Sequence, residues 1–371
     1  MASALSDLRV LDFSRVLAGP FATMMLADLG ATVTKVERPG TGDETRSWGP
    51  PYDERGAATY FQSVNRNKTS IVLDLSADRD LQRAKALMRE SDVLVENFRP
   101  GVMERLGLSY EQLQTEHSSL IYCSITGFGA GAGAELPGYD LLVQALGGLM
   151  SITGRADGEP QKVGVALVDV LAGLFATVGI LTALRHRQAT GEGQLVEVDL
   201  ISALLSGLVN QASAYTIAGV VPRRLGNEHP SIAPYELLAS ADGELVIAVG
   251  TDRQFSGLCD VLGAPELATD PRYEHNSDRV SNRRELRAEL ESRLAPRPAR
   301  EWAELLTAAR VPAGVVNDIE GAFELAASLG LDPVVTIPRE DGSAVRLTRN
   351  PVRLSRTPPT YRAAPPSLPE T

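Results

Sequence analysis

The chain has 371 residues, enough for two domains of ordinary size and a full hydrophobic core. Hydrophobic residues make up 43% and charged residues 22%, close to the averages of soluble globular proteins, which argues against a disordered, collagen-like or disulfide-stapled chain. A net charge of -11 disfavours binding of nucleic acid or anionic membranes over the whole surface, and it leaves a local basic pocket open.

Cysteine and histidine usage points to a reducing compartment and to no metal. Cys123 and Cys259 lie far apart without a CxxC spacing, and the four histidines are scattered. The N-terminus lacks the apolar core of a signal peptide. The longest apolar run, 163–184, is interrupted by Asp169 and by glycines and is predicted to fall short of a membrane span. We therefore expect a cytoplasmic protein, most simply an enzyme.

The first half of the chain alternates short β-rich runs with helical patterns. This alternation predicts a mainly parallel sheet covered by helices on both faces. The expected strands are 9–13, 32–37, 70–75, 93–98 and 120–125, and the expected helices are 20–29, 79–91, 109–117, 169–187 and 201–218.

After about residue 224 the pattern changes. A hairpin is predicted to turn at Asp242-Gly243, followed by two charged helices, a strand-then-helix segment, a β-rich stretch and a proline-rich tail that is not expected to be ordered on its own. The fold class is α/β with a second, smaller domain. The expected division is a large domain over 1–224, a small α+β domain over 225–330, and a C-terminal segment over 331–371 that returns to the first.

The first β–α–β unit does not carry a dinucleotide fingerprint. The run 14–20 after the first strand has one glycine where the fingerprint needs three, and the glycines of 127–133 recur with period two. Neither a P-loop nor a GxSxG nucleophile motif is present. Nicotinamide oxidoreduction, nucleotide hydrolysis and serine hydrolase chemistry therefore lose support.

Asp169 is the only charge in a long apolar stretch, so its carboxylate needs a reason to be there. Two compatible explanations stay open. It caps the helix that follows, or it is a catalytic carboxylate held near a helix N-terminus and shielded from water.

Basic residues gather near the ends of predicted strands. Arg38 follows the second strand, Lys68 precedes the third, and Arg99 and Arg105 follow the fourth. Ligands of open α/β sheets bind beyond the carboxyl ends of the strands, so these cations are candidates for binding phosphates together. For any one of them alone, a solvated loop charge is the simpler explanation.

Several runs together resemble the class III CoA-transferases, the family that includes formyl-CoA transferase. The resemblance extends over nearly the whole chain and is carried by Leu17-Ala18-Gly19-Pro20, the run 35–43, Asn65-Arg66-Asn67-Lys68, the run 96–101, the run 124–129 and Gly138-Tyr139-Asp140. It implies a Rossmann-like large domain, a small domain, and two identical subunits interlocked as a homodimer.

The resemblance also implies roles for individual residues. Asp169 matches the nucleophile that attacks an acyl-CoA thioester, with nearby backbone N–H groups stabilising the oxyanions. CoA and acyl-CoA are substrates, and no permanently bound cofactor is implied. The implied CoA contacts are Arg38, Lys68 and Arg105 at the phosphates, Leu17, Ala18, Asn97 and Phe98 along the nucleotide and pantetheine, and Tyr139 and Asp140 beside the thioester.

Two finer distinctions follow from the same resemblance. The α-methylacyl-CoA racemases of this family carry a histidine where this chain has Tyr139, and a phenol is a poor general base at neutral pH. Racemisation is therefore the alternative and transfer the first hypothesis. The runs around Arg46 and His229 look like those of the succinyl-CoA:dicarboxylate branch, which makes both residues candidates for contacts to the substrate.

Overall fold

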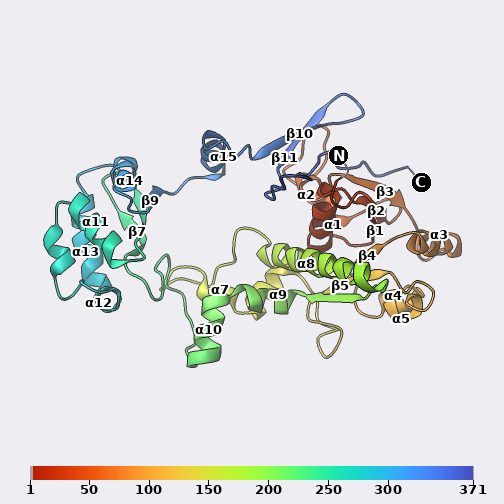
Figure 1. Cartoon of the computed structure of the whole chain (residues 1–371), viewed down its shortest axis with the longest axis horizontal. Helices are drawn as coiled ribbons and strands as arrows, with labels where there is room; N and C mark the ends of the chain where they lie inside the picture. Colours follow the sequence, from red (N-terminus) through yellow and green to blue (C-terminus); the bar gives the residue numbers. More distant parts are fainter. Residues whose placement is uncertain (1–2, 371) are drawn as a thin grey trace. The chain divides into compact units, whose positions relative to one another are not determined.

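The computed structural model describes residues 3–370, which form two compact units (Figure 1). Unit 1 comprises the described parts of Met1–Leu149, Lys162–Val220 and Asp332–Thr371, and unit 2 comprises Met150–Gln161 and Val221–Leu331. The division differs from the one expected from the sequence because residues 150–161 group with unit 2, which also begins at Val221 instead of residue 225 and ends at Leu331 instead of residue 330.

Unit 1 is built on a six-stranded parallel sheet with the order β3-β2-β1-β4-β5-β6. Its strands are β1 (Arg9–Asp12), β2 (Thr32–Glu37), β3 (Lys68–Val72), β4 (Val93–Glu96), β5 (Ile121–Thr126) and β6 (Leu195–Asp199). This is the strand order of doubly wound sheets, in which successive connections leave β1 and β4 in opposite directions and open a crevice between them. The predicted parallel sheet is confirmed.

The strand that the sequence did not predict is β6, which pairs with β5 at the edge of the sheet. Its five residues LVEVD are half-buried or exposed, so they lack the continuous apolar run that marks the central strands. Short edge strands therefore leave a weaker signal in the sequence than β4, all four residues of which are buried.

Helices cover both faces of the sheet, as predicted. One face carries α1 and α8, and the other carries α3, α4 and α5, whose apolar side chains pack on those of β1, β4 and β5. The helices of unit 1 are α1 (Ala18–Asp28), α2 (Thr59–Ser63), α3 (Asp78–Arg89), α4 (Val102–Arg105), α5 (Tyr110–Leu113), α6 (Asp140–Leu146), α8 (Leu167–Thr190), α9 (Leu200–Gly207) and α10 (Val209–Ala218), and α7 (Leu149–Ile152) lies where the two units join in the chain.

The helix α8 corrects one expectation. By length and composition it is long and apolar enough to cross a membrane, and α9 with α10 passes the same test as a pair bent by 84°. Core helices of soluble proteins pass it too, and α8 buries Ala172, Ala176 and Ile180 against the rest of unit 1. The glycines that interrupt its sequence serve this packing: a Cβ at Gly173 would lie 2.6 Å from the carbonyl oxygen of Ala18 in α1.

The C-terminal segment adds the hairpin β10 (Val334–Pro338) and β11 (Ala344–Thr348) and then runs along unit 1. Its anchor is the buried Asp28, which binds Arg66 through both carboxylate oxygens at 2.9 and 2.6 Å. Asn67, bonded to the same carboxylate, donates to the Thr360 carbonyl at 2.8 Å. The Arg46 guanidinium donates to the Pro366 carbonyl at 3.1 Å, so the proline-rich tail is also held by a side chain of unit 1.

Unit 2 contains a three-stranded antiparallel sheet of order β7-β8-β9. Its strands are β7 (Tyr235–Ala239), β8 (Glu244–Ala248) and β9 (Ala313–Val315), and its helices are α11 (Asp252–Val261), α12 (Asn276–Ser281), α13 (Arg283–Leu294), α14 (Ala299–Ala308) and α15 (Ile319–Ser328). The hairpin at Asp242-Gly243 is confirmed. Leucines of α13 and Trp302 of α14 fill a separate core with the apolar side chains of β7 and β8.

Candidate active site

A cavity of about 310 Å³ opens in unit 1 beyond the carboxyl ends of β1, β4 and β5. This is the crevice that the strand order creates, and it is where open α/β sheets bind ligands. Seven of the residues predicted for the site line it together, namely Leu17, Ala18, Asn97, Phe98, Tyr139, Asp140 and Asp169.

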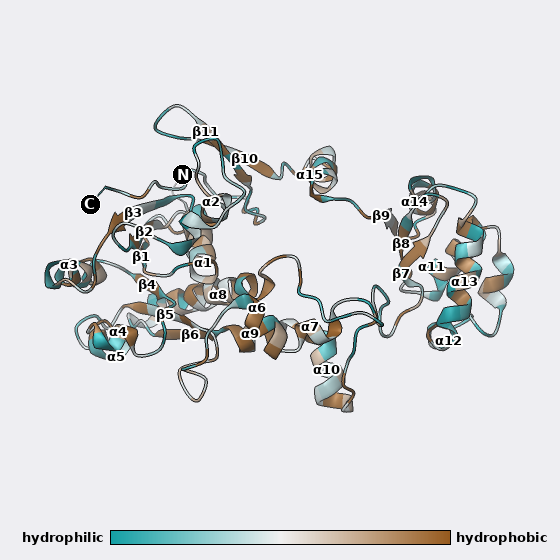
Figure 2. Cartoon of the chain, turned by 180° about the vertical axis from the view of Figure 1, so that it is seen from behind, coloured by the Kyte–Doolittle hydropathy of each residue, from teal (hydrophilic) through white to brown (hydrophobic). Residues whose placement is uncertain are grey.

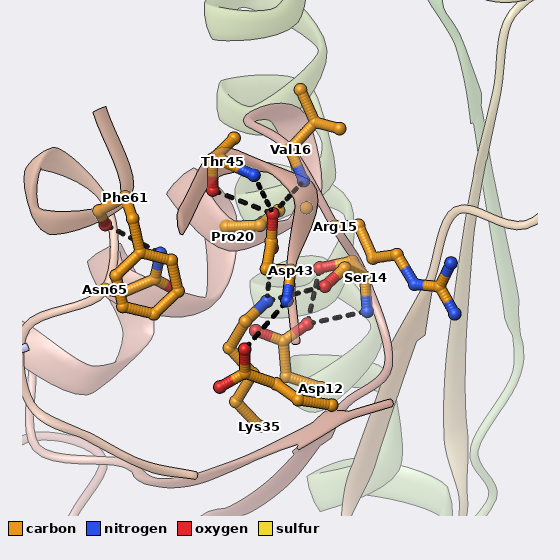
Figure 3. A network of polar contacts seen from close by, with 12 residues as sticks. Asp12, Ser14, Arg15, Val16, Pro20, Lys35, Asp43, Thr45, Phe61 and Asn65 are labelled. Carbon is orange, nitrogen blue, oxygen red and sulfur yellow. Dashed lines mark hydrogen bonds and ion pairs between the residues drawn. The ribbon is translucent and has the colours of Figure 1, made fainter. Parts of the chain in front are cut away.

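The loop that leaves β1 forms one wall of this cavity, and buried charges hold it from below (Figure 3). Asp12 accepts hydrogen bonds from the backbone N–H and the hydroxyl of Ser14. The Lys35 ammonium donates to the Ser14 carbonyl at 2.8 Å and pairs with the Asp43 carboxylate at 2.9 Å. Asp43 in turn accepts from the Val16 N–H at 3.3 Å, so the loop is tied to charges from β1, β2 and the segment after β2.

This support allows a backbone conformation that valine rarely adopts. Val16 has a φ of 67°, in the left-handed region, where a β-branched residue is strained. Residue 19 must be a glycine, because a Cβ at this position would lie 2.3 Å from the Ser14 side chain. The single glycine of this run therefore serves a close approach between loop and helix, not a phosphate loop.

A second support comes from the loop after β4. The Asn97 side chain accepts from the Arg15 N–H at 2.9 Å and donates to the Arg15 carbonyl at 2.8 Å. The Arg15 guanidinium lies over the Phe98 ring, 4.8 Å from its centroid. Asn97 thus lines the cavity while its amide is used to fix the neighbouring loop.

The start of α8 differs from what the sequence suggested. Asp169 is the third residue of the helix and does not cap it, because the N-cap position is Ala166. The capping acceptor is Asp140 of α6, whose carboxylate accepts the N–H groups of Val168 at 2.8 Å and of Asp169 at 3.4 Å. A residue close in space but 29 positions away takes the place of a local cap.

Asp169 is left half-buried, with no hydrogen bond or ion pair to its carboxylate from any residue within 3–370. Burial first, and the negative charge of Asp140 second, raise the pKa of Asp169 to about 7. The neighbouring Tyr60 lies in the same negative electrostatic potential. Burial first and the charge of Asp169 second raise the pKa of its phenol to about 12. The site therefore holds a carboxylate that is partly withdrawn from solvent and has no cation from the described residues beside it.

The first backbone N–H groups of α8 are already hydrogen-bonded within unit 1. The Leu167 N–H donates to the Val165 carbonyl at 2.8 Å, and the next two N–H groups donate to Asp140. Stabilisation of an oxyanion by nearby backbone N–H groups stays a prediction, and these three groups are not free for it in this structure.

Arg38 lies beside a smaller hollow of about 200 Å³ that shares Arg15 and Phe98 with the main cavity. Glu44 stands between the two arginines, 3.5 Å from the Arg15 guanidinium and 3.2 Å from that of Arg38. Sequence reasoning missed Arg15, although it follows β1 directly at the crevice. It also missed the far wall of this hollow, Asp74-Leu75-Ser76, which follows β3.

Two other predicted residues are committed to the framework of unit 1. Lys68 is fully buried and donates to Asp12 at 3.1 Å, the Pro20 carbonyl at 2.9 Å and Asn65 at 2.9 Å. The Arg46 guanidinium forms two bonds of 2.7 Å to Glu37 and stacks on Phe61. Neither lines either hollow.

The remaining two predicted residues lie outside both hollows. Arg105 is exposed at the end of α4. His229 belongs to unit 2, where its ring packs on Tyr235 and its Nδ1 accepts the Ser231 N–H at 3.1 Å.

A parallel sheet of this order, with a carboxylate in the crevice at its switch point, defines unit 1 as a doubly wound ligand-binding α/β unit. The family model for CoA-transferase family III matches residues 5–370. The chain therefore belongs to CoA-transferase family III and is a CoA-transferase, which confirms the resemblance stated from its motifs.

Individual relatives are similar to this chain over nearly its full length. The succinate–glutarate CoA-transferase of Agrobacterium fabrum is 42% identical, with 99% of this chain and 93% of that protein covered. The acetyl-CoA:oxalate CoA-transferase of Acetobacter aceti is 41% identical, with 98% and 92% covered. The crystal structure of a CAIB/BAIF family protein from Brucella suis superposes with a TM-score of 0.87 at 41% identity, covering 99% of this chain and 97% of that one.

Proposed function

We propose that this enzyme transfers CoA from an acyl-CoA donor to a carboxylic acid through covalent intermediates on Asp169. The observation that carries the proposal is the Asp169 carboxylate, which lines the cavity, accepts no hydrogen bond from any residue of 3–370 and has a pKa raised to about 7. A carboxylate deprived of hydration is a stronger nucleophile towards an acyl group than one in water.

The reaction starts when an Asp169 oxygen attacks the thioester carbonyl of the donor. The C–S bond breaks, leaving an aspartyl mixed anhydride and CoA thiolate. The thiolate then attacks the aspartyl carbonyl, which gives an aspartyl-CoA thioester and releases the donor acid as a carboxylate. The acceptor carboxylate attacks this thioester, and the same two steps in reverse form the new acyl-CoA and regenerate Asp169. No net proton is consumed.

Within unit 1, the two hollows fit the two ends of CoA. Arg15, which lines both hollows, and Arg38, which lines the smaller one, supply positive charge that suits a diphosphate, with Glu44 paired to both of them in this structure. Leu17, Ala18 and Phe98 offer apolar surface towards Asp169 for the pantetheine. Lys68 and Arg46 stay outside this proposal because their contacts hold the framework.

For the acids, the names of the relatives favour short dicarboxylates. The Agrobacterium relative is named for succinate and glutarate, and the Acetobacter relative for acetyl-CoA and oxalate. We assign succinyl-CoA as donor and a dicarboxylate as acceptor. Racemisation at an α-carbon is the alternative, and Tyr139, 63% exposed, offers no general base for it at neutral pH.

The working form is proposed to be a cytoplasmic homodimer. On unit 1, α6, α8 and α10 carry solvent-exposed apolar side chains, among them Leu146, Val178 and Ile217. Helix α9 is also largely apolar (Figure 2). Large exposed apolar surfaces mark association sites. Sedimentation of the purified protein tests this, and a monomer at micromolar concentration would contradict it.

The direct test is Asp169→Asn, which keeps the size of the side chain and removes the nucleophile. Transfer from succinyl-CoA to glutarate should fall by roughly a thousandfold or more. Glu192→Gln, the same chemical change at an exposed position of unit 1, should leave the rate unchanged. Hydroxylamine added with acyl-CoA should trap a hydroxamate at Asp169, seen by mass spectrometry. Full turnover by Asp169→Asn, or solvent deuterium at the α-carbon of the acyl group, would overturn the proposal.

A further inference from the structure

Gln144 is a fully buried polar residue to which neither the family resemblance nor the proposed mechanism assigns a part. It lies in α6, one turn after Asp140. Its amide nitrogen donates to the Asp140 carboxylate at 2.6 Å and lies 3.5 Å from the Val165 carbonyl, and its amide oxygen accepts the Val163 N–H at 2.9 Å. A buried amide with its oxygen and nitrogen both paired is costly to replace and defines a single orientation.

These bonds connect Gln144 to the nucleophile from two directions. Through Asp140, which accepts the Val168 and Asp169 N–H groups, it reaches the first turn of α8. Through Val163, it holds the irregular segment that leads into that turn. One side chain thus joins α6, the approach to α8 and the backbone of Asp169 itself.

We propose that Gln144 is the positioning residue of the transfer reaction, which fixes Asp169 against the thioester by orienting Asp140 and the segment before α8. The inference rests on the proposed function, because it gives Gln144 a part in the same reaction. Gln144 does not line the cavity, so it acts through Asp140 and does not touch the substrate.

The charge at this point follows from the same geometry. Asp140 uses one carboxylate oxygen for the Val168 and Asp169 N–H groups of α8 and the other for Gln144, so three N–H donors fix the one negative charge that faces Asp169 from α6. Among the described residues, Tyr60 of α2 also lies near enough to Asp169 for their charges to interact, and Arg15, Glu44 and Tyr139 line the same cavity. A change at residue 144 therefore alters both where Asp140 sits and how strongly it repels the charge on Asp169.

Two substitutions separate these effects. Gln144→Met keeps the length of the side chain and removes every polar bond, so kcat should fall between about 10- and 100-fold, as expected when a reacting group is displaced by about an ångström. The Kd of CoA, measured by calorimetry, should stay within about twofold because Gln144 does not contact the cavity. Gln144→Glu keeps the acceptor for Val163 and places a second carboxyl against Asp140. The acid limb of the kcat–pH profile should then move up by about one pH unit.

Gln114, exposed after α5, provides the matched controls Gln114→Met and Gln114→Glu, which should change neither kcat nor the pH profile. A loss of thermal stability with kcat and acid limb unmoved in both Gln144 variants would overturn the inference and leave Gln144 a merely structural residue. If Gln144→Met does not fold, Gln144→Glu decides alone, and an unmoved acid limb overturns the inference. Asp169→Asn distinguishes this failure from failure of the proposed function, because only the latter leaves that variant active.

Discussion

Two aspartates in unit 1 show how the surroundings of a carboxylate decide whether it stabilises the fold or is available for a reaction. Asp12, at the end of β1, is fully buried and surrounded by donors: Lys68, Ser14 and Thr23. Burial by itself would raise its pKa, but Lys68 and Lys35 lower the pKa below its ordinary value. Asp169, at the start of α8, receives no hydrogen bond or ion pair at its carboxylate from the residues that the structure describes, and its pKa is raised to about 7. A carboxylate that accepts several hydrogen bonds stabilises the fold, whereas a carboxylate without such donors is destabilised and therefore more reactive.

The largest effect should come from breaking the buried ion pair between Lys68 and Asp12. Lys68→Met removes a buried cation from Asp12 and leaves its charge less compensated, so the free energy of unfolding should fall by about 3–5 kcal/mol. Urea unfolding measures it, with Lys85→Met on α3 as a control that should change stability by less than about 0.5 kcal/mol. Unchanged stability with lost CoA binding would instead favour the phosphate contact predicted from the sequence.

The second effect tests the ionisation of Asp169 through the pH dependence of the rate. Only the ionised Asp169 attacks a thioester, and a pKa of about 7 means that it takes up a proton as the pH falls through 7. The rate should therefore drop about tenfold per pH unit below 7, or roughly 100-fold at pH 5. The measurement is kcat between pH 5 and 9, with circular dichroism showing that the fold persists. An acid limb near pH 4 would mean that the site does not raise the pKa.

The third effect concerns the cations that stay accessible, in contrast to the buried lysines. Arg15→Ala and Arg38→Ala should each raise the Kd of CoA about tenfold and weaken its dependence on salt, because each removes charge-assisted bonds to phosphate. Arg79→Ala, exposed on α3, is the control. Equal affinities for all three variants would place the diphosphate elsewhere.

The smallest effect has the opposite sign from the first. A folded-state pKa raised from 3.8 to about 7 means that the folded protein binds more protons than the unfolded chain between these values, so Asp169 costs stability as pH rises through this window. Asp169→Asn should stabilise the protein at pH 8 by about 1 kcal/mol, a value reduced because the side chain is partly exposed. Thermal unfolding at pH 5 and pH 8 checks it. A gain that is equal at both pH values would contradict the ionisation argument.

Much of the site could be predicted because its residues lie at the ends of strands. The alternation of strands and helices places the loops after β1, β4 and β5 at one edge of the sheet, so Leu17, Asn97 and Phe98 had to come together. Lys68 shows the limit of that argument. It stands at the first residue of β3, at the opposite end of the strand from the ligand edge, and its side chain points into the packed network beneath α1.

The sequence alone determined the parallel sheet, the smaller second domain and the identity of Asp169 as the unusual charge, because hydrophobic periodicity and a lone acid in an apolar run are local properties. Only the tertiary structure decided what surrounds each charge. It buried Lys68, paired Arg46 with Glu37, brought Asp140 to cap α8 and placed Gln144 behind it. The pKa of a carboxylate and the orientation of a side chain depend on partners distant in sequence, and no local pattern records them.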